Sequence, residues 1–261
     1  VKKPTPKPAP TKKPAPKPAA KSVPASKPAP VPVPVKKPEP APVFKPVFEA
    51  PEPKPAAPSS APASKLVMKT GAGGATALTI AAQACLLLLN RPRGYYPGLR
   101  QILVYPGSFV VQREHMDGMG IAHHGRQVLA GESWSEGQVI LSWHDTLQGA
   151  ANPNDGHNVV IHEFAHQLDQ ETGAANGAPV LARHDQYARW SQVLGAEYRQ
   201  LQARAPGDET SLFSDYGATD PAEFFAVISE VFFEQPQRMA TEHPALYGEL
   251  ARFYRLDPLS W

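Results

Sequence analysis

Two histidines and a glutamate stand close together in a pattern that is typical of metal-dependent hydrolysis. Residues 159–169 read VVIHEFAHQLD and contain His162, Glu163 and His166. On a helix, residues four apart lie one above the other, so the two imidazoles can share one zinc ion. Glu163 projects about 100° around the helix from His162, where its carboxylate can reach a metal-bound water without displacing it. The pattern predicts a zinc site with Glu163 as the general base.

A catalytic zinc usually has three protein ligands, so a third must lie elsewhere in the chain. The extended HExxHxxGxxH pattern is excluded, because Thr172 occupies the position of its third histidine. Four downstream carboxylates are candidates: Asp215, Asp220, Glu223 and Glu230. Asp220 and Pro221 are typical of a helix start, so Glu223 has a competing role in a capping box. Glu230, two turns later, could equally be solvated.

Other polar residues near the motif have two interpretations each. Asp169 lies on the histidine face of the same helix, where it either orients a ligand imidazole or is solvated. Six other histidines lack ligand spacing, and we expect them at the surface or outside the ligand sphere: His123, His124, His144, His157, His184 and His243.

The elements around the motif indicate an α+β fold. The helix at 158–170 carries an apolar stripe of Ile161, Phe164, Ala165 and Leu168, which should anchor it in the core. Strands are expected at 100–105, 109–112 and 138–143, and further helices at 77–89, 187–202 and 220–234. Because strands come early and helices late, the class is α+β. The strand at 138–143 either offers an edge to a peptide or lies buried in the sheet centre.

Composition divides the chain of 261 residues into a tail at 1–70 and a domain at 71–261. Residues 1–62 hold 21 of the 31 prolines, and all 14 lysines lie in residues 1–70. This Lys/Pro/Ala-rich part has too few apolar residues to form a core, so we predict a disordered tail that serves as a spacer or a weak electrostatic anchor. It lacks arginine and interleaved aromatics, which argues against specific nucleic acid binding. The domain carries 12 arginines and 21 acids and is therefore acidic.

Several classes of protein are excluded. The single cysteine, Cys85, rules out an internal disulfide framework and a cysteine-rich zinc site. The longest apolar run, 75–89, is shorter than the roughly 20 residues of a membrane-spanning helix, so no transmembrane segment is expected. No secretory signal is visible, and we expect a cytoplasmic monomer.

The segment HEFAHQLD, followed by Glu223 within SDYGATDPAEFFAVISEVFF, resembles the Mlc titration factor A family of zinc-dependent gluzincin peptidases. The resemblance extends over about residues 75–259. It implies that His162, His166 and Glu223 bind one zinc ion per chain and that Glu163 is the general base. It also implies that Tyr216 stabilises the transition state, although an ordinary half-buried aromatic is the competing interpretation.

The resemblance further implies a zincin-like metallopeptidase domain, with a small and mostly antiparallel sheet, an HExxH active-site helix and a helical C-terminal part. The implied activity is hydrolysis of short peptides or free N-termini, as in an aminopeptidase. An alternative is a regulatory protein that binds a glucose-responsive transcriptional repressor and whose metal site is structural.

Overall fold

The structure is a computed structural model, and it describes residues 67–69, 73–91, 94–116, 122–134, 136–173, 175–204, 206–208 and 210–261. Except for residues 67–69, the predicted tail lies outside the described residues, so its disorder and its boundary at residue 70 stay predictions.

Strands precede most of the helices along the described chain, which confirms the α+β class. The strands are β1 (Val67–Lys69), β2 (Gln101–Tyr105), β3 (Phe109–Met116), β4 (Ala122–Leu129), β5 (Gly131–Trp134) and β6 (Gln138–Ser142). The α-helices are α1 (Gly74–Leu86), α2 (Trp143–Ala151), α3 (Val159–Asp169), α4 (Gln186–Gln202), α5 (Pro221–Glu234), α6 (Pro236–Glu242) and α7 (Pro244–Tyr254). The 3₁₀-helices are η1 (Gln170–Thr172), η2 (Asp215–Ala218) and η3 (Pro258–Ser260).

The main sheet is mixed, which corrects the expectation of a mostly antiparallel sheet. Its strand order is β1-β2-β6-β5; β1 pairs with β2 and β2 with β6 in parallel, and only β5 pairs with β6 in antiparallel fashion. The parallel pairs arise because long connections separate these strands in the sequence. Helix α1 joins β1 to β2, and β3, β4 and β5 lie between β2 and β6 in the chain.

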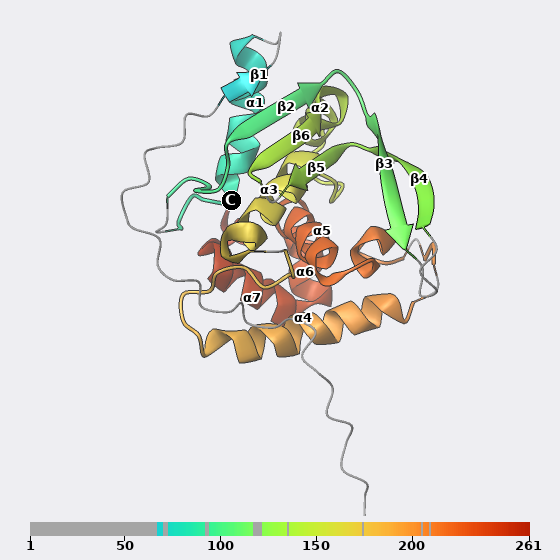
Figure 1. Cartoon of the computed structure of the whole chain (residues 1–261). Helices are drawn as coiled ribbons and strands as arrows, with labels where there is room; N and C mark the ends of the chain where they lie inside the picture. The colour runs from blue at the N-terminus through green and yellow to red at the C-terminus, as the bar shows by residue number, and fades with distance from the viewer. Residues whose placement is uncertain are drawn as a thin grey trace, which may run out of the picture. The chain divides into compact units, whose positions relative to one another are not determined.

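Strands β3 and β4 form a separate antiparallel hairpin, with a register from Phe109 opposite Leu129 to Met116 opposite Ala122. Figure 1 shows this hairpin extending away from the four-stranded sheet. Its last residues lead through Ala130 directly into β5, so the hairpin and the sheet edge are continuous along the chain.

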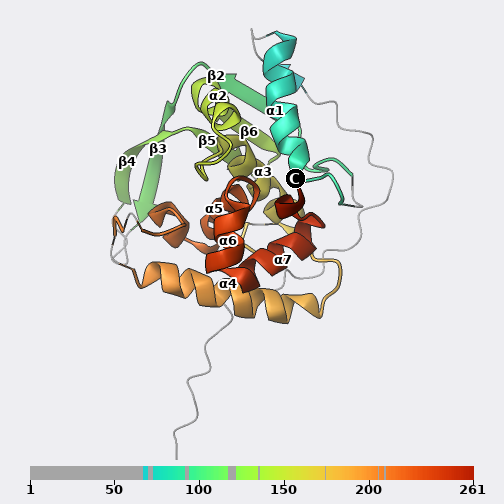
Figure 2. The ribbon, with the colours of Figure 1, turned by 180° about the vertical axis from the view of Figure 1, so that it is seen from behind.

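Helix α3 lies between the main sheet and the C-terminal helices. It contacts β5 and β6 on one side and α5 on the other, and Figures 1 and 2 show α4, α6 and α7 beyond α5. The predicted apolar stripe is confirmed, because Ile161, Phe164, Ala165 and Leu168 are all buried. Burying a side chain such as Phe164 stabilises the fold by roughly 1.5–3 kcal/mol. The buried apolar side of α3 therefore fixes the position of its polar side.

Side-chain caps set where the two central helices begin. Asn158 Oδ1 accepts hydrogen bonds from the N–H groups of Val160 and Ile161 at the start of α3. Asp220 Oδ1 accepts from the N–H groups of Ala222 and Glu223 at the start of α5. Such caps satisfy donors that have no partner within the helix and fix which residues fall on each helix face.

Within the part of the chain that the structure describes, no helix combines the length and the apolar character needed to cross a bilayer.

Candidate metal centre

The histidines of α3 and a glutamate of α5 converge on one point. Glu223 Oε2 lies 3.0 Å from His162 Nε2 and 3.2 Å from His166 Nε2. One ligand atom of each residue lies within 4.8 Å of the others. In a tetrahedral zinc site with bonds near 2 Å, neighbouring ligand atoms stand about 3.3 Å apart. The spacing therefore fits a metal ion, and two imidazoles with a carboxylate are a donor set that suits zinc.

The environment of Glu223 agrees with a ligand rather than with a helix cap. Asp220 supplies the side-chain cap of α5, and the Glu223 carboxylate instead faces the two histidines. Burial opposes its ionisation, but hydrogen bonds with His162 and His166 hold the pKa of Glu223 below its ordinary value. The capping-box interpretation of this residue is not what the structure shows.

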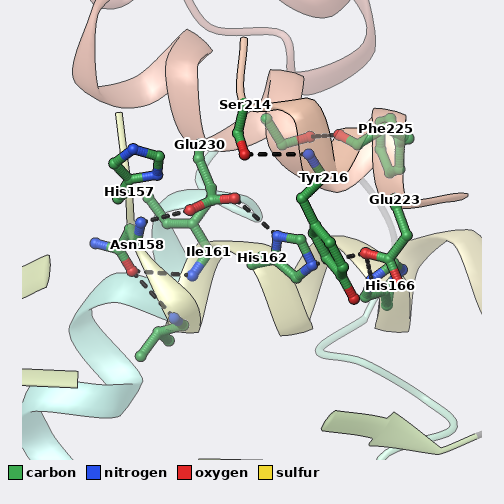
Figure 3. A network of polar contacts seen from close by, with 12 residues as sticks. His157, Asn158, Ile161, His162, His166, Ser214, Tyr216, Glu223, Phe225 and Glu230 are labelled. Atoms are coloured by element: carbon green, nitrogen blue, oxygen red, sulfur yellow. Dashed lines mark hydrogen bonds and ion pairs between the residues drawn. The ribbon is translucent and has the colours of Figure 1, made fainter. Parts of the chain in front are cut away.

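The other carboxylates that sequence spacing left open have other partners. Asp220 caps α5, and Asp215 accepts from the N–H of Gly207 at 2.6 Å. Glu230 lies behind the site, where His162 donates from Nδ1 to Glu230 Oε1 at 2.7 Å. The other oxygen of Glu230 accepts from the N–H of Asn158 at 2.5 Å. Glu230 thus orients His162 so that Nε2 faces the convergence point (Figure 3).

The electrostatic environment of His162 follows from this position. Burial lowers its pKa, but the Glu230 and Glu223 carboxylates outweigh that effect and raise the pKa of His162 well above its ordinary value. The imidazole is therefore held where positive charge is stabilised, which also favours a bound cation.

Glu163 lies beside the ligands and beneath the edge strand. Its side chain is buried, and burial raises the pKa of Glu163 from 4.5 to about 7, although both imidazoles act in the opposite direction. Strand β5 can lie this close to helix α3 because residue 131 is glycine. A Cβ at Gly131 would stand 2.7 Å from both Glu163 Cγ and Val159 Cγ2. Gly131 therefore makes room for the carboxylate that the sequence predicts as general base.

Tyr216 extends from η2 toward the same place. Its ring centroid lies 5.8 Å from that of His162, and 41% of the residue is exposed. Figure 3 shows its side chain reaching down from η2 toward α3, where His162 and His166 lie. The N–H of Tyr216 donates to Ser214 Oγ at 3.2 Å, which helps to fix η2. An exposed phenol beside the three candidate ligands is placed to meet a molecule that enters from solvent.

Two cavities meet at these residues. One, of about 470 Å³, extends toward the hairpin and the start of α3, and the other, of about 440 Å³, extends toward Gln170 and Asn176. Both are lined by Leu129, Gly131, His162, Glu163 and Tyr216. The site is therefore open on two sides, which suits an extended ligand that passes over the metal position.

The strand that borders these cavities is β5. Strand β6, which the sequence offered as either an edge or a buried strand, lies between β2 and β5 and is largely buried. Among the described strands β5 pairs with β6 alone, and the sequence did not predict it. Its residues GESW lack the alternation that marks a strand, so only Gly131 could have signalled a close backbone contact.

Asp169 has a different role from either expected one. It is fully buried, and its Oδ2 accepts from the N–H groups of Asn176 and Gly177 at 2.9 and 2.7 Å. Its Oδ1 has no hydrogen-bond partner among the residues that the structure describes. Burial raises the pKa of Asp169 to about 6. This residue anchors the loop that walls one cavity.

The other histidines whose side chains the structure describes do not join the ligand set. His144 lies beside Gln148, and His184 packs against Tyr187. His243 is buried and contacts Glu197 at 2.8 Å, far along the chain from α3. His157 lines the cavity near the start of α3. The side chains of His123 and His124 lie outside the described residues.

An HExxH helix between a sheet edge and a helix that carries a glutamate is the arrangement of a metallopeptidase domain. Residues 68–255 match the family described as glucose-regulated metallo-peptidase M90, which is most of the chain. The chain belongs to this M90 metallopeptidase family.

Similar proteins agree with this assignment. The chain is 44% identical over 183 residues to an uncharacterized protein of Synechocystis sp., covering 70% of this chain and 66% of that protein. It is 41% identical over 166 residues to Mlc titration factor A of Serratia proteamaculans, covering 62% of each. Against Mlc titration factor A of Klebsiella pneumoniae it is 38% identical over 184 residues, covering 69% of this chain and 68% of that protein. The chain thus spans about two thirds of the length of these relatives.

Proposed function

We propose that this chain is a zinc-dependent peptidase that hydrolyses peptide bonds with Glu163 as general base. The observation that supports it best is the convergence of His162, His166 and Glu223 on one point next to Glu163, in a site open to solvent. A zinc ion held by these three residues would act as a Lewis acid and lower the pKa of a water molecule toward 7.

The side chains of the chain itself would carry the proton transfers. Glu163 would accept a proton from the attacking water and return it to the leaving amine. The Tyr216 hydroxyl would donate a hydrogen bond to the oxygen on which negative charge develops. Glu230 would hold His162 in the tautomer that presents Nε2 to the metal. A peptide would lie along β5, which pairs with no strand other than β6 among the described residues.

Glu163→Gln tests this proposal. The variant should keep the zinc content of the wild type, because residue 163 is not one of the three ligands, and should lose peptide hydrolysis by roughly 10²- to 10⁴-fold. Glu242→Gln is the matched control, since Glu242 is an exposed glutamate on α6 that pairs with Arg238. Zinc would be quantified by metal analysis, and cleavage would be profiled with a peptide library. A Glu163→Gln protein that cleaves as fast as the control would contradict the proposal.

Within this function we propose an aminopeptidase-like preference for short peptides with a free N-terminus. The support is the family resemblance, together with carboxylates that line the groove and would attract an ammonium group, among them Asp145 and Asp155. Matched peptides with free and acetylated N-termini separate the possibilities. Faster cleavage of the free form is expected, and equal rates would instead indicate an endopeptidase.

The second candidate function is binding of a transcriptional repressor in the cytoplasm, with the metal site structural. It is favoured by the relatives that carry the name Mlc titration factor A. Under this alternative, the Glu163→Gln variant would still bind a purified repressor, and its effect on that repressor would be no weaker than the effect of wild type. A pull-down with the variant and a peptidase assay on the same protein distinguish the two functions.

A further inference from the structure

A third cavity lies away from the metal centre and is lined by arginines. Its volume is about 380 Å³, and it lies among the start of α4, the end of α7 and residues 180–182. Figures 1 and 2 both show α4 and α7 side by side. The cavity shares no lining residue with the two cavities of the metal centre. Four arginines line it: Arg91, Arg189, Arg252 and Arg255.

Arg91 carries a buried donor without a hydrogen bond. Its side chain is only 5% exposed, and its guanidinium carbon lies 4.7 Å from the ring centroid of Phe253, another lining residue. Arg91 Nη2 lies 3.8 Å from Glu171, which is an ion pair but too long for a hydrogen bond. Among the residues that the structure describes, nothing accepts a hydrogen bond from Arg91 Nη1. A buried guanidinium donor is costly to leave unsatisfied, so the Arg91 side chain favours an additional acceptor.

The other charges of the cavity leave an excess of positive charge. Arg189 and Arg252 both pair with a single carboxylate, that of the buried Glu249. The second lining acid, Asp185, is bound by Arg183, which is not a lining residue. The first residues of α4 add the positive end of a helix dipole. The described lining residues thus include four arginines and two acids, which leaves an excess of two positive charges.

We propose that this cavity binds a small organic oxyanion, with a phosphate or carboxylate group at the arginines. Guanidinium forks match both groups because they donate two parallel hydrogen bonds. Trp190, Phe253 and Leu181 line the same cavity and offer apolar surface to the rest of the ligand. The volume exceeds that of a bare oxyanion and lies at the lower end of the range for small-molecule sites. This proposal does not depend on the proposed peptidase activity.

Isothermal titration calorimetry on the full zinc-loaded chain tests the site at constant ionic strength. Inorganic phosphate is the probe in one arm and citrate in the other, so that the arms separate phosphate from carboxylate recognition. We expect saturable binding of one probe at one site per chain. Arg91→Met should weaken it at least ~10-fold, because it removes the buried fork and keeps the apolar stem.

Two further variants keep the test decisive if Arg91→Met fails to fold. Arg252 is about half exposed, so Arg252→Gln should fold and bind the probe roughly threefold or more weakly. Arg238→Gln is the control, since Arg238 is an equally exposed arginine on α6 outside the cavity, and it should bind like wild type. Absence of saturable binding for both probes would overturn the proposal. Binding that persists unchanged in Arg252→Gln would overturn it too, because the anion would then lie elsewhere, for example at the metal.

Discussion

Helices α3 and α5 meet at two polar clusters that use the same residue types in opposite ways. In the capping cluster of Asn158, Glu230 and Glu234, every carboxylate oxygen accepts a hydrogen bond. Glu230 accepts from His162 and from the Asn158 backbone, and Glu234 accepts from Asn158 Nδ2 and from the N–H of Gly156. In the ligand cluster of His162, His166 and Glu223, two ring nitrogens and a carboxylate oxygen crowd onto one point.

The difference shows what distinguishes a structural cluster from a ligand site. Donors and acceptors alternate in the capping cluster, so it is complete without any other group. Lone pairs face one another in the ligand cluster, and they are compatible only when a cation, either a proton or a metal ion, lies between them. The presence of glutamate does not separate the clusters, since both contain it. The direction in which the lone pairs point distinguishes the two clusters.

Glu223→Gln should give the largest change, and it acts on the ligand cluster alone. Loss of one of three protein ligands should lower zinc affinity roughly 100- to 1,000-fold, if the binding free energy is shared about equally among the ligands. Competition with a zinc chelator measures the affinity. Glu242→Gln serves as the exposed control, and an unchanged affinity in Glu223→Gln would remove the distinction between the two clusters.

Glu230→Gln tests the one residue that connects the clusters. Because Glu230 orients His162 through Nδ1, its substitution should weaken zinc binding by about 10- to 100-fold. Glu234→Gln is the matched variant one helical turn later, and it contacts Asn158 and Gly156 but not the histidines. Chelator competition should show wild-type affinity for Glu234→Gln. Equal losses of zinc affinity in Glu230→Gln and Glu234→Gln would mean that the capping cluster affects zinc binding only through the overall stability of the fold.

Asn158→Ala removes the centre of the capping cluster. It deletes the cap of α3 and the side-chain hydrogen bonds to Gln83 and Glu234, so the free energy of unfolding should fall by about 1–2 kcal/mol or more. Denaturant unfolding of the zinc-loaded protein measures this change. Asn90→Ala is the comparison, since Asn90 is exposed and donates a single hydrogen bond to the Arg255 carbonyl. If Asn158→Ala lowered the free energy of unfolding no more than Asn90→Ala does, the stability of α3 would not depend on the capping cluster.

A further expected effect, confined to a limited pH window, is a pH dependence that belongs to Glu234. Burial raises its pKa from 4.5 to about 7, although the hydrogen bonds from Asn158 and Gly156 act in the opposite direction. The folded state then binds this proton more tightly than the unfolded state, so stability falls as pH rises from 4.5 to 7 and levels off above that. One such group contributes a slope of at most about 1.4 kcal/mol per pH unit.

Glu234→Gln cannot ionise at this position, so the difference in unfolding free energy between wild type and variant should change across that pH window. Unfolding curves at a series of pH values give the difference directly. A difference that is constant between pH 4.5 and 7 would mean that Glu234 titrates normally in the folded protein.

The sequence alone determined the features that depend on local spacing. Residues four apart share a helix face whatever surrounds the helix, so His162, His166 and the apolar stripe of α3 could be placed in advance. The start of α5 could also be predicted from local sequence, because an aspartate followed by a proline is a strong signal for the start of a helix. Spacing already favoured Glu223 over each of the other carboxylates, and the sequence resemblance strengthened that prediction.

Only the tertiary structure decided which groups from distant segments meet. The packing of α5 against α3 gave Glu223 and Glu230, seven residues apart, different partners: Glu223 faces Nε2 of His162 and His166, whereas Glu230 faces Nδ1 of His162 alone. The strand order made β5 rather than β6 the sheet edge, and Gly131 allowed it to approach Glu163. The arginine-lined cavity combines Arg91 with residues of α4 and α7 that lie about 100 or more positions later. Local periodicity fixes the direction of a side chain from its own helix, but what that side chain meets depends on long-range packing and on burial.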